Sequence, residues 1–330
     1  MGLKDNPERF HGLLKRLGKA AVALVASAAT LAGGMLVAGT AQAAAGPGYY
    51  ANPMSGSAAG GWWVGTGSFF LGPQDDSKPY KYCVEFSNPY DWQNQGTWTP
   101  VDTDDGKKAA YLVDKYQNDG DALTQAALAY AIHDHFDRNQ AWWNEAKTKM
   151  TLVGGDINAV RNRAATIWAE ANDMPSTIQA SYRYMQGKRK GTFDPGIKTG
   201  DGRWVAGATY TITDLNKVAK FDGSNDYTIT GTTTGAEEHL PWTATGNGKT
   251  NFQITRKIPR VAVSNSSSQD LLKPTDPETQ SANIQFEVRR DFQPTVTTEV
   301  NSRELKRGET VQDKSTKDPL HNVTGPFIWR

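Results

Sequence analysis

Hydrophobic and polar positions along the chain follow three successive patterns. From Tyr49 to Thr99, short runs rich in glycine and aromatic residues, such as "GGWWVGTGSFFLG", predict strands joined by tight turns. From about Lys107 to Gln186 apolar residues recur at helical spacing, and from about Arg203 to Val296 strand alternation returns. This order predicts an α+β chain in which a helical cluster separates two β-rich regions.

The central region predicts four or five helices, each with a capping residue or glycine near a boundary. We expect them over residues 107–117, 120–137, 141–150, 156–173 and 176–186. Asp121 is the expected N-cap of the second helix. The later strands are expected over residues 204–212, 226–234, 251–258, 261–264 and 282–288. Their spacing predicts an all-β, Ig-like antiparallel sandwich, with the glycine-rich segment 190–202 as the boundary before it.

The N-terminus predicts export. Basic residues lead into the apolar run "AAVALVASAATLAGGMLVAG", which ends at "AQA", Ala41–Ala43. Small residues at the first and third of these positions suit a signal peptidase, so residues 1–43 are predicted to be a signal peptide. The alternative is an uncleaved membrane anchor. We expect a secreted or cell-surface protein with no membrane span in the mature chain.

The charge balance argues against an electrostatically driven partner. Lys and Arg total 36 against 35 for Asp and Glu. A chain so close to neutral is not expected to bind nucleic acid.

Cys83 is the only cysteine among 330 residues. In "YKYCVEF" strand alternation puts Tyr80, Tyr82, Val84 and Phe86 on one face and Cys83 on the other. An odd cysteine in an exported protein is a candidate reactive thiol, and the alternative is a small buried apolar residue.

Gln125 is a second unusual residue, because it shares the apolar stripe of the second predicted helix with Leu128, Ala129 and Ile132. Its amide either bonds to a neighbouring backbone or joins Cys83. Attack of the thiol on the amide would expel ammonia and leave a thioester. The free N–H groups of the first helical turn would then stabilise the oxyanion.

"YCV" at Tyr82–Val84 and "TQAAL" at Thr124–Leu128 resemble the two short motifs of the Cys-Gln thioester domains of Gram-positive bacterial surface adhesins. The resemblance implies a thioester domain at residues 44–190, a β-sandwich stalk domain at 200–296 and the start of an incomplete further β module at 297–330. It also implies a Cys83–Gln125 thioester that captures amines, most plausibly Lys, on host extracellular proteins. This is single-turnover bond formation rather than enzymatic catalysis, and it needs no cofactor or metal. The family's LPxTG-type anchor motif is not in the sequence, so we expect a fragment or a released protein.

Two other functions remain open. A secreted cysteine hydrolase would use Cys83 with His133 or His135 as its base. A non-covalent glycan-binding surface protein would use the tryptophan pairs at 62–63 and 142–143, although core packing of one member of each pair is the preferred interpretation. In "HDHFD" we expect an exposed polar helix end rather than a metal site at His133 and Asp137.

Overall fold

The computed structural model describes residues 46–52, 54, 57–58, 61–62, 69–88, 96–290, 296–300 and 313–317. All of them belong to one compact unit, Ala43–Arg330, which has the α+β composition expected. The predicted signal peptide lies outside the described residues, as does most of the predicted module at 297–330. No helix of the described residues is long and apolar enough to span a membrane.

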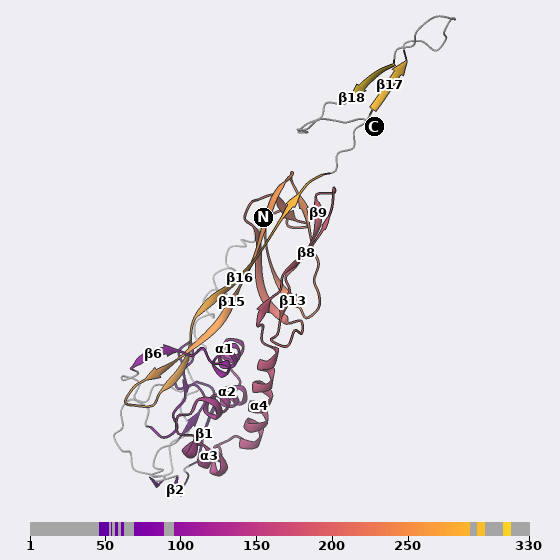
Figure 1. Ribbon diagram of the computed structural model, residues 1–330. Coiled ribbons are helices and arrows are strands. Elements are labelled where there is room, and N and C mark those ends of the chain that lie inside the picture. Colours follow the sequence, from indigo (N-terminus) through magenta and orange to yellow (C-terminus); the bar gives the residue numbers. More distant parts are fainter. Residues whose placement is uncertain are drawn as a thin grey trace, which may run out of the picture. The chain divides into compact units, whose positions relative to one another are not determined.

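Helices and strands of this unit are shown in Figure 1. The helices are α1 (Asp104–Tyr116), α2 (Ala122–Phe136), α3 (Gln140–Lys149), α4 (Ile157–Glu170) and the 3-10 turn η2 (Ala171–Asp173). The strands are β1 (Tyr49–Tyr50), β2 (Ser57–Ala58), β3 (Gly61–Trp62), β4 (Phe70–Leu71), β5 (Tyr82–Cys83), β6 (Thr97–Pro100), β7 (Thr177–Ile178), β8 (Ser181–Met185), β9 (Lys190–Asp194), β10 (Ile197–Lys198), β11 (Ala206–Asp214), β12 (Ala219–Phe221), β13 (Thr228–Thr234), β14 (Leu240–Ala244), β15 (Gly248–Asn265), β16 (Leu271–Val288), β17 (Val296–Val300) and β18 (Asp313–Lys317).

Four of the predicted helices are confirmed as α1 to α4. Each begins after a polar residue whose side chain accepts a hydrogen bond from a backbone N–H of the first turn. These caps are Thr103, Asp121, Asn139 and Asp156. Each cap satisfies a donor that has no partner within the helix, which explains why the helices begin at these residues.

The fifth predicted helix, at residues 176–186, is wrong. This segment forms β7 and β8, and β8 pairs antiparallel with β9. Its Thr, Ile and Tyr side chains favour strands, and the neighbouring strand supplies the hydrogen bonds that a helix would have made internally. The segment 190–202, where the domain boundary is predicted, contains β9 and β10.

β15 and β16 form a hairpin of two 18-residue strands (Figure 1). The expected strands at 261–264 and 282–288 left "KPTDPE", 273–278, between them as a connection, yet β16 runs through it. The register shifts between Ile258 and Arg260, which leaves Pro259 and Pro277 outside the paired positions. A bulge lets both strands continue past residues that cannot donate to the ladder.

The hairpin contributes to two separate hydrophobic cores. Its Val261 and Leu272 lie in the first core, which is built mainly from α1, α2, α4 and the strands before them. Its Phe252 and Phe286 lie in the second core, which combines residues of a six-stranded and a four-stranded sheet. Part of the segment 200–296 therefore completes the core of the segment 44–190. Whether the second core belongs to the Ig-like class stays a prediction.

Candidate functional site

Cys83 lies in β5, at the end of the six-stranded sheet, where it pairs with Leu271 of β16. Its side chain is 1% exposed, and Sγ accepts a hydrogen bond of 3.3 Å from the Glu85 N–H. Tyr82 and Val84 belong to the first core, whereas Cys83 does not. The alternation read from the sequence therefore gave the correct face, but that face is covered rather than open to solvent.

Burial raises the pKa of the Cys83 thiol well above its ordinary value. The Glu85 N–H offsets part of this shift, and the charges of Asp137, Glu85 and Asp270 raise the pKa further. Desolvation and nearby negative charge both disfavour the thiolate. Cys83 is consequently a neutral thiol at neutral pH, and any attack by it requires proton transfer to a neighbouring base.

Gln125 lies in the first turn of α2 and is fully buried. Its Nε2 donates to the carbonyl oxygens of Tyr116 and Asp119, each at 2.7 Å. Its Oε1 accepts a 2.7 Å hydrogen bond from the Tyr82 hydroxyl. These bonds satisfy both amide hydrogens and one oxygen lone pair, and among the described residues none joins Gln125 to Cys83.

The Asp121 cap is confirmed, but the oxyanion role expected for the first turn of α2 has no support in the contacts. The Asp121 carboxylate already accepts a hydrogen bond from the Thr124 N–H, and the Gln125 N–H donates to the Asp121 carbonyl. The hydroxyl of Tyr82 is the group that binds the Gln125 carbonyl oxygen. Burial raises the pKa of Tyr82, so this hydroxyl remains a neutral donor.

Gln269, which the sequence analysis did not identify, is the glutamine that the structure holds beside the Cys83 turn. It lies in the connection between β15 and β16, two residues before the partner of Cys83 in the ladder. Its Nε2 donates to the carbonyl oxygens of Glu85, at 3.2 Å, and Asn88, at 3.3 Å. Its Oε1 is buried and has no hydrogen-bond partner. A buried carbonyl oxygen without a donor is uncommon in proteins and calls for an explanation.

The backbone around this pair of residues is held by several further hydrogen bonds. The Val84 N–H donates to the Asp270 carbonyl at 3.0 Å, and the Asp270 N–H donates to the Glu85 carboxylate at 3.3 Å. Asp270 is fully buried, and its carboxylate forms an ion pair of 2.6 Å with Arg138. The site therefore joins a thiol, a carboxamide and two carboxylates in a largely desolvated turn.

His133 and Asp137 form a buried pair at the end of α2, so the prediction that they lie on an exposed helix end is wrong. His133 Nδ1 lies 2.8 Å from Asp137 Oδ2, and the same oxygen accepts a 2.8 Å hydrogen bond from the Phe86 N–H. His135 instead lies 3.3 Å from Asp105 and stacks on Trp168. In the described part of the chain no hydrogen bond joins Cys83 to either histidine, so the contacts do not assemble the base expected of a cysteine hydrolase.

The tryptophan pairs are partly described. Trp143 is fully buried and stacks with His133 at a centroid distance of 4.6 Å, which confirms core packing for one member of that pair. The side chains of Trp62 and Trp63 lie outside the described residues. Because Trp143 is buried, Trp142 and Trp143 together form no exposed aromatic surface for a glycan.

No protein-family model and no curated protein matches the chain. Among solved structures, it is similar to the Bacillus anthracis TIE protein, with 13% identity and a TM-score of 0.40, over 83% of this chain and 55% of that one. It is also similar to the thioester domain of the Enterococcus faecium TIE86 protein, with 12% identity and a TM-score of 0.34, over 75% of this chain and 99% of that one. The chain thus spans about half the length of the B. anthracis protein. Its structural neighbours are thioester domain proteins.

Proposed function

We propose that this protein is a covalent adhesin that carries an internal thioester between Cys83 and Gln269. The observation that carries the proposal is the position of the Gln269 carboxamide. It donates to the Glu85 carbonyl, while the Glu85 N–H donates to the Cys83 sulfur. One residue, Glu85, thereby holds both reacting groups.

In the bond-forming step the sulfur of Cys83 replaces the amide nitrogen of Gln269. Sγ of Cys83 attacks Cδ of Gln269, the C–N bond of the amide breaks, and the thiol proton leaves with the amide nitrogen as ammonia. The neighbouring carboxylates of Glu85 and Asp270 are the candidate bases that take the proton from the thiol and return it to the departing nitrogen. The product contains neither a thiol nor an amide donor, which suits a buried junction.

Gln125, the partner predicted from the sequence, has a different environment. Three hydrogen bonds hold its amide against Tyr82, Tyr116 and Asp119, and all of them would be lost or rearranged if it reacted. Gln269 would lose only the two longer hydrogen bonds of its Nε2, because its oxygen has no partner to lose. We therefore favour Gln269 and keep the Cys83–Gln125 pair as the alternative that the experiment must distinguish.

The proposed activity is the capture of amines on host extracellular proteins. A neutral Lys amine attacks the thioester carbonyl, the carbon–sulfur bond breaks, and Cys83 regains its proton. The target then stays attached to Gln269 through an amide. Each molecule reacts once, so the protein is a reagent and not an enzyme. Secretion or surface display, inferred from the predicted signal peptide, would bring it to such targets.

Intact mass spectrometry of the purified protein tests the bond itself. We expect a mass one ammonia below that of the mature sequence. Cys83→Ala and Gln269→Ala should restore the full mass, whereas Gln125→Ala should keep the deficit. Restoration by Gln125→Ala and not by Gln269→Ala would establish the alternative pair. A wild-type mass that equals the unmodified sequence would reject an internal thioester altogether.

A second experiment tests capture. Mixing the protein with a host extracellular matrix preparation should give a complex that survives boiling in detergent. Formation should accelerate as pH rises toward the ordinary Lys pKa of about 10.4, since only the neutral amine attacks. Complexes that form equally well with Cys83→Ala would contradict thioester chemistry. A free thiol that is alkylated at once, with no mass deficit, would favour the cysteine hydrolase instead.

A further inference from the structure

A second cluster of chemically active side chains lies in the four-stranded sheet. Asp194 ends β9, which pairs with β14 so that Phe193 lies opposite Leu240. One step further along this antiparallel ladder, His239 comes opposite Asp194. Residues directly opposite each other in neighbouring strands project from the same face of a sheet, so the two side chains are brought together by the register.

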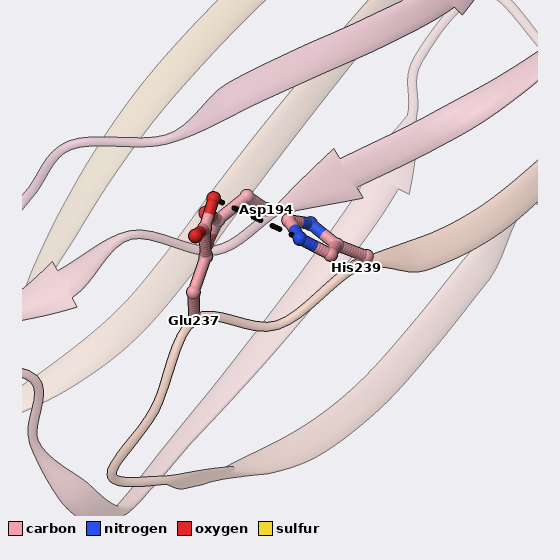
Figure 2. A group of neighbouring side chains, drawn as sticks. All are labelled: Asp194, Glu237 and His239. Carbon is pink, nitrogen blue, oxygen red and sulfur yellow. Dashed lines mark ion pairs between the residues drawn. The ribbon is translucent and has the colours of Figure 1, made fainter.

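Glu237 joins them because of alternation in the segment before β14. Glu238 points away from the cluster, where its carboxylate accepts hydrogen bonds from the Thr234 N–H at 2.6 Å and the Tyr210 hydroxyl at 3.1 Å. With Glu238 fixed on one side, Glu237 and His239 lie on the other. Figure 2 shows the two carboxylates and the imidazole facing one another.

The three side chains each offer one ligand atom, and these atoms all lie within 4.8 Å of one another. Zn²⁺ bonds to carboxylate oxygen and imidazole nitrogen are about 2.0–2.2 Å, which puts ligand atoms about 3–4 Å apart. Asp194 is fixed, with 6% exposure and a 2.9 Å hydrogen bond from the Gly196 N–H to Oδ1. Glu237 and His239 are exposed enough to make the small adjustment that remains.

The charge of the cluster also favours a cation. The ligand oxygens of Asp194 and Glu237 lie within 4.8 Å of each other, so their negative charges repel. Arg183 Nη2 lies 3.7 Å from Glu237 Oε1 and compensates this repulsion only weakly. A divalent ion between the ligand atoms would offset the repulsion directly.

We propose that Asp194, Glu237 and His239 form a binding site for a divalent transition-metal cation, with Zn²⁺ as the best fit. Two carboxylate oxygens and one imidazole nitrogen suit Zn²⁺ better than Ca²⁺ or Mg²⁺, which prefer all-oxygen coordination. Three protein ligands leave room for water. The ion would cross-link the end of β9 to the segment that enters β14, in a part of the chain remote in sequence from Cys83 and independent of its chemistry.

Calorimetric titration of ZnCl₂ into the tag-free, chelator-treated protein tests the site. We expect one binding event, which Asp194→Asn and His239→Gln should each weaken by more than the roughly 10–100-fold known for loss of an outer-shell partner. The matched control is His135→Gln. It removes the imidazole of another exposed histidine–carboxylate pair, His135 and Asp105, and should leave Zn²⁺ binding unchanged.

Thermal unfolding supplies a readout that does not depend on calorimetry. Zn²⁺ should raise the melting temperature of the wild type and of His135→Gln, but not of His239→Gln. Circular dichroism of His239→Gln without metal should match the wild type, because the side chain is exposed. Absence of Zn²⁺ binding to the wild type, or binding that survives His239→Gln at full affinity, would overturn the proposal.

Discussion

Gln125→Ala should destabilise the fold because Gln125 joins β5, α2 and the end of α1 through one buried amide. Truncation leaves the Tyr82 hydroxyl, which is fully buried, without its acceptor. The Tyr116 carbonyl keeps a second donor, the Asp119 N–H at 2.9 Å, and the half-buried Asp119 carbonyl can turn to water. One orphaned buried donor costs about 1–3 kcal/mol, and the lost side-chain packing adds a comparable amount. We expect a loss of about 3 kcal/mol.

Urea denaturation followed by circular dichroism measures this loss, and a double-mutant cycle assigns it. Tyr82→Phe removes the donor while keeping the ring. The double variant Tyr82→Phe/Gln125→Ala should therefore be less destabilised than the sum of the single variants, by about 1 kcal/mol. Gln140→Ala is the matched control, since the exposed Gln140 also donates to two backbone carbonyls, those of His133 and Asp137. It should cost less than about 1 kcal/mol.

The reasoning fails if Gln125→Ala is as stable as Gln140→Ala, or if the cycle shows additivity. Either result would mean that the buried amide is not the bridge that its hydrogen bonds indicate. The experiment is informative about the thioester as well, because a destabilised variant that still lacks one ammonia excludes Gln125 as the reacting residue.

Three other predictions concern the chemistry of Cys83, the Asp121 cap and the buried His133–Asp137 pair. Methylamine should add once to Gln269 and simultaneously expose Cys83 to alkylation, and complete alkylation before amine is added would contradict this. Asp121→Ala should cost about 1 kcal/mol at neutral pH. Hydrogen bonds from the first turn lower the pKa of Asp121, so its contribution is present above the ordinary pKa of about 3.9 and is lost as pH falls through the folded pKa. Urea titrations of both proteins should therefore converge in acid. Asp137→Ala should cost about 3 kcal/mol, because it leaves the Phe86 N–H and a buried histidine without their acceptor, and a melting temperature within error of the wild type would refute that estimate.

Local sequence signals predicted the helices well, because each capping side chain binds a backbone N–H only two or three residues further along the chain. They failed at residues 176–186, where polar and aromatic residues at mixed spacing are compatible with either state. The pairing of β8 with β9 decides in favour of a strand. They failed again at 273–278, because proline clusters usually end strands, and only a bulge in β16 opposite Pro259 of β15 allows β16 to continue.

The candidate site was predictable only in part. Strand alternation correctly placed Cys83 on the face opposite Tyr82 and Val84. The carboxylates near Cys83, those of Asp137, Glu85 and Asp270, agree with that placement. Its neighbour Gln269 was missed, since the two come together only through pairing of β5 with a strand far along the chain. The sequence signal that could have found it is a glutamine two positions before an apolar pair, Leu271 and Leu272, that starts a strand. Gln125 was instead selected by its apolar helix face, and its hydrogen bonds explain that position without any reaction.

The connection between β15 and β16 has a mechanical consequence if Gln269 carries the target. Tension from the captured molecule would enter the protein at a hairpin turn and pass along the covalent backbone of both strands into the second core. Val261 and Leu272, near the turn, pack in the first core, so the helical region would share the load there. The two strands would be pulled in the same direction, so their mutual hydrogen bonds would not be peeled apart from the tip. A bond placed in this turn would therefore hold a host surface under pulling through the covalent backbone of two strands anchored in both cores.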